Sequence, residues 1–213
     1  ARSKKIDVLF GISPGIDFNF DDLDKKEENN DFKILLKKCR HSLRLGAKSV
    51  VLQFDDIPDD FSDINISEGE THAKVANKLS DNLESDIYVV PRIYSDELIK
   101  PNNSYLLDFG FHIKTLIKIF YCGKNIVEKK INRNSLKKVS KFLRNEIVLW
   151  DNFYANDYCP SKLFVGPWRD RSSKMSIMIN PTGMIETDLI IIDIVGNQLL
   201  NTDYKNWKNV IIE

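Results

Sequence analysis

Short hydrophobic runs alternate with amphipathic stretches along most of this chain. Six runs are rich in Val, Ile, Leu and aromatic residues, have the length of buried β-strands and end at polar or turn-forming residues. These runs lie at residues 6–15, 49–54, 86–91, 116–121, 146–150 and 174–179. The pattern therefore predicts six strands.

Helical periodicity fills most of the intervals between these runs. Residues 31–45 place Phe32, Leu35 and Cys39 on one face, and Gly46 follows as a typical helix terminator. The remaining predicted helices span residues 71–83, 104–113, 134–143 and 186–195. Alternating strands and helices predict an α/β fold with a parallel sheet, either an open doubly wound sheet or a (β/α) barrel.

Polar and aromatic residues follow several of the predicted strands, and their distribution separates these two architectures. They are Asp55 and Asp56, Tyr94, Cys122, Trp150 with Asp151 and Asn152, and Asn180. A site fed by many strand ends is the layout of a barrel, whereas an open sheet concentrates its ligand at one switch point. No GxGxxG or P-loop sequence follows any strand. The sequence therefore favours the barrel.

The bulk composition is that of an ordinary globular protein, with 42% hydrophobic and 29% charged residues among 213. Lys+Arg and Asp+Glu both number 31, which argues against a nucleic-acid-binding protein that relies on phosphate neutralisation. The apolar run at residues 189–195 is too short to span a bilayer and contains Asp193. We therefore expect neither nucleic acid nor a membrane as a partner.

Cysteine usage indicates a reducing compartment, and we expect a cytoplasmic protein. Cys39, Cys122 and Cys159 form no CxxC motif, and no histidine completes a metal-binding pattern with any two of them. No signal peptide precedes the first strand. We therefore predict free thiols, no structural metal and no cofactor.

The strand at residues 49–54 leads directly into two adjacent carboxylates, Asp55 and Asp56. Such a pair is costly at the end of a buried strand unless a ligand, a cation or a shared proton compensates for the charge. A solvated acidic turn explains the same residues equally well, because Asp is a common turn former. A third interpretation adds Asp59 and Asp60 as oxygen ligands for Mg²⁺ or Ca²⁺ in a metal-dependent hydrolase.

Several segments, in this order and spacing, resemble the catalytic domain of glycoside hydrolase family 84, the family of O-GlcNAcases and bacterial β-N-acetylglucosaminidases. The similar segments are 10–15 (FGISPG), 54–57 (FDDI), 72–73 (HA), 150–152 (WDN), 155–158 (ANDY), 163–167 (LFVGP) and 179–181 (INP). The resemblance covers about residues 6–195. It implies a (β/α)8 TIM-barrel type of fold and a retaining β-N-acetylglucosaminidase that uses the 2-acetamido group of its substrate as the nucleophile.

The resemblance also implies roles for individual residues. Asp55 would accept the acetamide N–H and stabilise the oxazolinium, while Asp56 would act as general acid and then as general base. The implied substrate-binding residues are Tyr94, Cys122, Trp150, Asn152, Asp157 and Asn180. Trp150 also fits a plain core residue, Tyr94 an ordinary half-buried tyrosine and Asn180 a turn before Pro181. His72 fits a helix-surface or supporting position better than a catalytic one.

The chain departs from the family pattern at its beginning. Residues 6–15 resemble the third barrel strand, so about six βα units (strands 3 to 8) fall within an N-terminally incomplete domain at residues 1–196, and residues 197–213 form a tail. Further departures are Cys122, where the family usually has threonine, and Arg92-Ile93 in place of Thr-Glu. We expect a glycoconjugate or glycoprotein carrying N-acetylglucosamine as the partner, and a second chain or a missing N-terminal segment that completes the barrel. The alternative is a weak or inactive relative that binds a sugar or a protein.

Overall fold

The chain forms two compact units in the computed structural model. The first comprises Ala1–Tyr121 and Lys138–Ile147, and the second comprises Cys122–Lys137 and Val148–Glu213. The structure describes residues 5–15, 17–20, 23, 30–57, 67–101, 103–131, 133–161, 163–168, 170–171 and 175–200. Each unit is described separately below.

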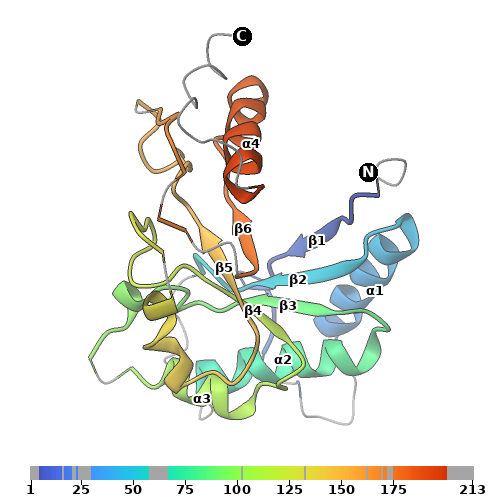
Figure 1. Ribbon diagram of the computed structural model, residues 1–213. Helices are drawn as coiled ribbons and strands as arrows, with labels where there is room; N and C mark the ends of the chain where they lie inside the picture. The colour runs from blue at the N-terminus through green and yellow to red at the C-terminus, as the bar shows by residue number, and fades with distance from the viewer. Residues whose placement is uncertain are drawn as a thin grey trace. The chain divides into compact units, whose positions relative to one another are not determined.

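Four parallel strands form the centre of the first unit, and they lie in chain order (Figure 1). They are β1 (Leu9–Ile12), β2 (Ser49–Gln53), β3 (Ile87–Val90) and β4 (Lys118–Tyr121). In register, Leu9 lies opposite Ser49 and Val50 opposite Ile87. The strand order shows no reversal, which is the arrangement expected of consecutive strands in a (β/α) barrel.

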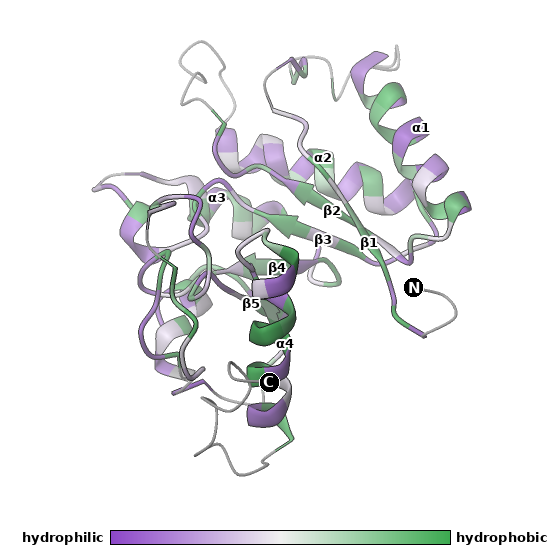
Figure 2. Ribbon diagram, turned by 90° about the horizontal axis from the view of Figure 1, so that it is seen from above, coloured by the Kyte–Doolittle hydropathy of each residue, from purple (hydrophilic) through white to green (hydrophobic). Residues whose placement is uncertain are grey.

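Three helices cover this sheet: α1 (Asn30–Leu45), α2 (Glu68–Asn82) and α3 (Tyr105–His112). Both views place α1 and α2 on the same side of the strands (Figures 1 and 2). As the periodicity predicted, α1 buries Phe32, Leu35 and Cys39. Helix α2 begins earlier than predicted because the Ser67 side chain accepts a hydrogen bond from the Glu70 backbone N–H, which caps its first turn.

The second unit is built around β5 (Ile147–Asp151), β6 (Ile177–Ile179) and α4 (Ile185–Leu199). The two strands pair in parallel, with Leu149 opposite Ile177. Helix α4 contributes to a hydrophobic core whose buried members are Tyr154, Trp168, Ile191, Ile194 and Val195. Because Tyr154 and Trp168 come from the segment after β5, the core fixes that segment against the helix.

All six predicted strands are present, with bounds shortened by a few residues, but the helix predicted at residues 134–143 is wrong. Two short 3₁₀ helices, Arg133–Leu136 and Val139–Lys141, occupy its place. Their backbone bonds join residues three apart, as in Phe142 N–H to Val139 O at 2.9 Å. Val139 and Leu143 are nevertheless buried, so the predicted apolar positions were right although the helix type was not. None of the helices in the described ranges is long and apolar enough to cross a membrane.

The contact between α2 and α3 depends on the missing side chain of Gly69. A Cβ built there would lie 2.2 Å from the Tyr105 carbonyl oxygen and 2.8 Å from the Phe109 nitrogen. Helix α4 contains the matched control, since a Cβ on Gly196 would meet nothing within 4 Å. We predict that Gly69→Ala lowers the free energy of unfolding by about 1–3 kcal/mol through overpacking.

Gly196→Ala should instead raise the free energy of unfolding by about 0.5–1 kcal/mol through helix propensity. Thermal and urea unfolding followed by circular dichroism measures both variants. Equal effects of the two substitutions would contradict the close packing of α2 on α3.

Candidate active site

The two adjacent carboxylates lie in a tight turn directly after β2. The Phe54 backbone N–H still bonds to the Val90 carbonyl at 2.9 Å, so the chain leaves the sheet at Asp55. Asp56 adopts a left-handed backbone conformation with φ of 56°, which Asp tolerates better than most residues. The turn leaves Asp55 partly buried and Asp56 exposed. Adjacent in sequence, the two carboxylates therefore have different environments.

Asp55 carries an unsatisfied carboxylate oxygen. Within the part of the chain that the structure describes, its Oδ1 atom is buried and has no hydrogen-bond partner. Burial raises the pKa of Asp55, a backbone hydrogen bond of Asp55 partly offsets this, and the neighbouring charge of Asp56 raises it further. An acceptor in this state is stabilised by any ligand that brings an N–H or O–H to it.

Tyr94 joins the pair from the neighbouring strand. Three residues, Pro91 to Ile93, separate it from the end of β3 and bring its half-buried side chain to the turn. Its hydroxyl donates to Asp56 Oδ1 at 3.4 Å, a long hydrogen bond. The structure thus brings together the three predicted site residues of the first unit.

Three of the predicted residues of the second unit, Cys122, Asn152 and Asn180, are joined by hydrogen bonds. The Asn152 side-chain amide donates to Cys122 Sγ at 3.4 Å and to the Ile126 carbonyl at 3.1 Å. The Asn180 side-chain amide donates to Asn152 Oδ1 at 3.2 Å. Cys122 and Asn152 are buried and Asn180 is half-buried, so this chain of three side chains is firmly held.

Two further predicted residues of this unit stand apart from that hydrogen-bonded cluster. Trp150 is half-buried in β5, opposite Met178 in register. Asp157 is exposed in the turn that follows. Over the described ranges, no hydrogen bond joins either residue to Asn152 or Asn180. The structure therefore joins three of the five predicted residues of this unit by hydrogen bonds. Trp150 and Asp157 are close to Asn152 in the sequence but are not part of this hydrogen-bonded set.

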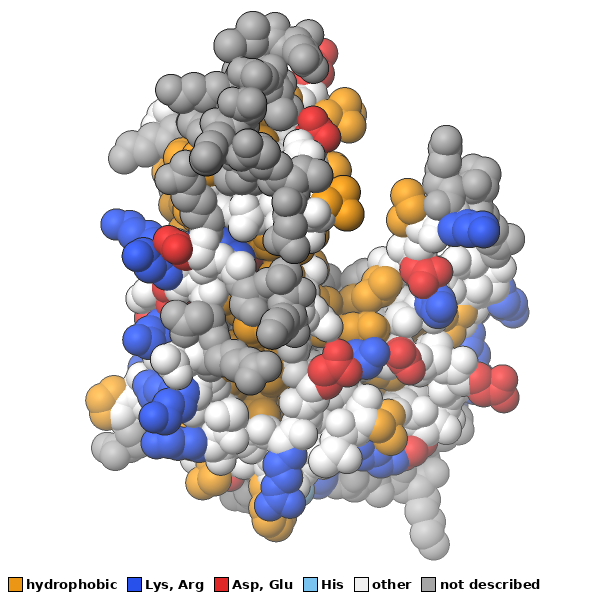
Figure 3. All heavy atoms as spheres, in the orientation of Figure 1, with side chains coloured by type: hydrophobic (Ala, Val, Ile, Leu, Met, Phe, Trp, Pro, Cys, Tyr) orange, Lys and Arg blue, Asp and Glu red, His pale blue; other side chains and the backbone are white. Residues whose placement is uncertain are grey.

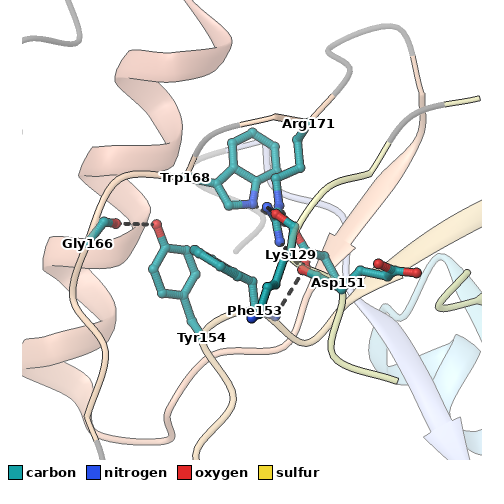
Figure 4. Close-up of polar contacts among 8 residues, drawn as sticks. Lys129, Asp151, Phe153, Tyr154, Gly166, Trp168 and Arg171 are labelled. Carbon is teal, nitrogen blue, oxygen red and sulfur yellow. Dashed lines mark hydrogen bonds and ion pairs between the residues drawn. The ribbon is translucent and has the colours of Figure 1, made fainter. Parts of the chain in front are cut away.

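Sequence reasoning missed the residue that anchors this segment, Arg171. Its guanidinium forms a fully buried ion pair with Asp151, with 2.9 Å between Nε and Oδ2 (Figure 4). The same guanidinium donates to the carbonyls of Glu128 and Lys129, at 2.7 Å each. Trp168 Nε1–H also donates to Asp151 Oδ2, at 2.8 Å. Asp151 is thus a structural residue. In the sequence, the one feature that indicates a buried partner for it is the costly position of its charge at the end of a strand.

Aromatic contacts hold the segment between Asn152 and Trp168 in place. The Arg171 guanidinium lies 4.0 Å from the centroid of the Phe153 ring. The Tyr154 hydroxyl donates to the carbonyl of Gly166, 12 positions later in the chain, at 2.8 Å (Figure 4). Asn152 directly follows Asp151, so the ion pair and these contacts set the position of its side chain.

The metal-dependent interpretation finds no support in the described residues. Asp59 and Asp60 lie outside them. Within the described ranges, no group of three or more His, Cys, Asp or Glu side chains is arranged to hold a metal ion. Asp55 and Asp56 alone supply too few ligands for the six to eight oxygens that Ca²⁺ takes.

Comparisons with known proteins agree with the resemblance noted in the sequence. The family model of β-N-acetylglucosaminidases matches residues 1–205. Protein O-GlcNAcase of Mus musculus is 29% identical to the chain over 223 aligned positions, which cover 98% of this chain and 23% of the mouse protein. The Rattus norvegicus protein matches with the same identity and coverage. The chain therefore spans less than a quarter of the length of these curated relatives.

Two solved structures share the fold. CpGH84B superposes with a TM-score of 0.81 and 23% identity over 99% of this chain and 39% of its own. A mutant of the Thermobaculum terrenum O-GlcNAc hydrolase gives a TM-score of 0.81 with 24% identity over 99% of this chain and 48% of its own. Together with the parallel strands in chain order, this likeness confirms the predicted fold class, a (β/α)-barrel type with about six βα units.

The burial of Asp55 predicts a stability cost at neutral pH. Its folded-state pKa lies above the unfolded value of about 3.8, so between these two values the folded state binds more protons and stability falls as pH rises. We predict that Asp55→Asn raises the free energy of unfolding at pH 7 by about 1 kcal/mol. The gain should shrink at about pH 3, below the unfolded value, where the wild-type carboxyl is mostly neutral in both states.

Urea unfolding at the two pH values measures this effect. Asp86→Asn is the matched control, because that carboxylate is exposed and paired only at the surface with Lys118. A loss of stability in Asp55→Asn at pH 7 would show that the folded protein satisfies this carboxylate.

Proposed function

Because the chain belongs to the β-N-acetylglucosaminidase family, we propose that it carries the catalytic carboxylates for retaining hydrolysis of terminal β-linked N-acetylglucosamine, with the sugar's own 2-acetamido group as nucleophile. The observation that carries the proposal is the pair at the end of β2: one buried acceptor with an unsatisfied oxygen, Asp55, beside one exposed carboxylate, Asp56. A substrate-assisted reaction needs both parts, an acceptor for the acetamide N–H and a carboxyl group that transfers protons.

Asp55 is the acceptor of the acetamide N–H in this proposal. When the acetamide oxygen attacks the anomeric carbon, the bond to the leaving oxygen breaks and positive charge spreads over the oxazolinium ring. A fixed carboxylate beside the acetamide nitrogen orients the group and stabilises that charge. Among the described residues the buried Oδ1 atom of Asp55 has no partner to give up, so it is available as this acceptor.

Asp56 is the proton-transfer residue. It protonates the leaving oxygen in the first step, and as a carboxylate it takes a proton from the water that opens the oxazolinium. The exposure of Asp56 fits a group that exchanges protons with water. The Tyr94 hydroxyl, at 3.4 Å from Asp56 Oδ1, orients that carboxylate.

Sugar binding is the role we propose for the predicted residues of the second unit. The Asn152 and Asn180 amides suit hydroxyl and acetamido groups, and the exposed Asp157 carboxylate suits sugar hydroxyls. Trp150 offers an apolar wall for the acetyl methyl group. Cys122, buried against Asn152, orients that amide.

We also propose that further βα segments cover two apolar surfaces of this chain. Strand β1 is exposed where β2 is buried, and a hollow of about 620 Å³ lies between it and the end of α1, lined partly by Val8, Leu9 and Leu45. On α4, Ile185, Leu189 and Ile192 are exposed at helical spacing, and Figure 3 shows hydrophobic side chains at the surface of this helix. Uncovered strand edges and apolar stripes of this kind are normally paired or packed.

The substrate class that we propose is a glycoprotein or smaller glycoside with terminal N-acetylglucosamine, encountered in the cytoplasm. Cys39, Cys122 and Cys159 are all free thiols, as a reducing compartment requires.

Loss of the proton-transfer carboxylate should slow turnover strongly. We predict that Asp56→Asn lowers kcat for an aryl N-acetyl-β-glucosaminide by about 10²–10⁴-fold. The loss should be smallest for the most acidic phenol, because a good leaving group needs little protonation. Asp81→Asn, an exposed carboxylate paired with Lys114, is the control and should leave kcat unchanged.

Initial-rate kinetics with phenols of different acidity measures this effect. A chelator should not change the rate. Loss of activity when a chelator is added would favour a metal-dependent hydrolase. Sugar binding without any turnover by the wild type would instead support the non-catalytic alternative.

Completion of the barrel should govern ligand affinity. We predict that an N-terminally extended form of the chain binds an oxazoline-mimicking thiazoline at least tenfold more tightly than residues 1–213 alone. Isothermal titration calorimetry on both forms measures this difference. Equal affinity of the two forms would contradict the proposal that further βα segments are needed.

A further inference from the structure

A network of four buried or half-buried polar side chains lies next to the carboxylate turn in the first unit, and the proposed chemistry does not use it. It consists of Glu68 and His72 on α2, Arg92 after β3 and Tyr105 at the start of α3. His72 is fully buried and Tyr105 nearly so. Polar groups buried at such cost call for a function or a strong structural reason.

The network contacts the turn through Phe54, the residue that precedes Asp55. The His72 ring stacks on the Phe54 ring with 4.0 Å between centroids and 7° between planes. Burial, and then the charge of Arg92, lower the pKa of His72 to about 3, so this ring is neutral at physiological pH. A neutral, flat ring thus packs face to face against the residue that places Asp55.

The Tyr105 hydroxyl links the histidine to the segment that carries Tyr94. It lies 3.0 Å from His72 Nδ1 and accepts a hydrogen bond of 2.9 Å from the Arg92 backbone N–H. Burial is the main reason that the pKa of Tyr105 is raised, so the phenol keeps its proton. We assign that proton to the bond with Nδ1, which leaves the imidazole proton on Nε2.

Glu68 fixes the other end of the network. Both of its carboxylate oxygens accept hydrogen bonds from Arg92, through Nε and Nη2. The guanidinium also lies 5.2 Å from the centroid of the Tyr105 ring. Arg92 is therefore held through its side chain by Glu68 and through its backbone by Tyr105, two residues before Tyr94.

We propose that Glu68, His72, Arg92 and Tyr105 are positioning residues for the carboxylate pair: through Phe54 they set Asp55, and through residues 92–94 they set the tyrosine that orients Asp56. This inference rests on the proposed function, since it assigns these residues to the same reaction. The network contacts the residues next to the carboxylates and not the carboxylates themselves. Its proposed role is to keep the positions of Asp55 and Asp56 fixed.

The decisive variant is Tyr105→Phe. It removes the hydroxyl between Arg92 and His72 while keeping the ring that stacks on Phe109 at 5.8 Å. Because misplaced catalytic groups lower the rate of chemistry, kcat should fall by about 10–100-fold while KM changes by less than about twofold. Tyr88→Phe is the matched control: its hydroxyl lies 3.4 Å from Lys118 Nζ in the same unit, and kcat should not change.

Glu68→Gln is a second, milder variant that keeps the shape of the Glu68 side chain beside Arg92. It should also lower kcat, by less than Tyr105→Phe does. Both variants are assayed well below their unfolding midpoints. A kcat for Tyr105→Phe within twofold of wild type would overturn the inference, as would an equal fall in Tyr88→Phe.

Amide hydrogen exchange separates this inference from the proposed function, because it needs no turnover. If the wild type hydrolyses no aryl N-acetyl-β-glucosaminide, the proposed function fails. The network is then tested by the hydrogen-exchange rate of the Arg92 backbone amide, which should be higher in Tyr105→Phe than in Tyr88→Phe. Unchanged exchange at Arg92 would overturn the network as well.

Discussion

The burial of one carboxylate oxygen of Asp55 is the constraint on which the interpretation of this structure depends. The folded chain takes a charged atom from water at the end of β2 and gives it no hydrogen-bond donor within the described residues. Such an arrangement reduces stability, and proteins retain it where a ligand supplies the missing donor. The acetamide N–H of N-acetylglucosamine is a donor of the required kind, and the exposed Asp56 beside it is free to exchange protons with water.

Each unit contains an ion pair, half-buried in the first and fully buried in the second, that holds a segment carrying proposed site residues. In the first unit, Glu68 and Arg92 hold the segment that leads to Tyr94. In the second, Asp151 and Arg171 hold the segment that begins at Asn152. Buried pairs of this type contribute little net stability, because desolvation offsets the attraction between the charges. Their geometry is well defined, however, because each guanidinium donates several directional hydrogen bonds, and this is the property that a site needs.

Strands and helices followed from the sequence wherever one pattern was strong. Hydrophobic runs such as Val50–Leu52 have no competing interpretation, and helix α1 has a clear apolar face and a glycine at its end. The helix predicted at residues 134–143 was wrong, because an apolar pattern such as Val139 and Leu143 can also be buried by short 3₁₀ helices and does not fix the helix type. The ordered motifs around Asp55, Trp150 and Asn180 were enough to indicate the family.

The supporting residues could not be read from the chain, because their partners are distant in sequence. Arg171 lies 20 residues after Asp151 with no periodic relation to it, and Tyr105 lies 33 residues after His72. Only the fold brings such side chains together. The costly position of a charge after a strand was visible, but the groups that compensate for it were not, and the burial of His72 was not visible either.

Carbon-13 NMR titration of the Asp55 and Asp56 side-chain carboxyls tests this account most directly, because it observes the acceptor itself in the folded chain. The account predicts that Asp55 titrates above its ordinary value of 3.8, and that addition of a thiazoline ligand changes its chemical shift. If Asp55 titrates at or below its ordinary value and its signal ignores the ligand, the buried carboxylate is already satisfied and the proposed chemistry has no acceptor.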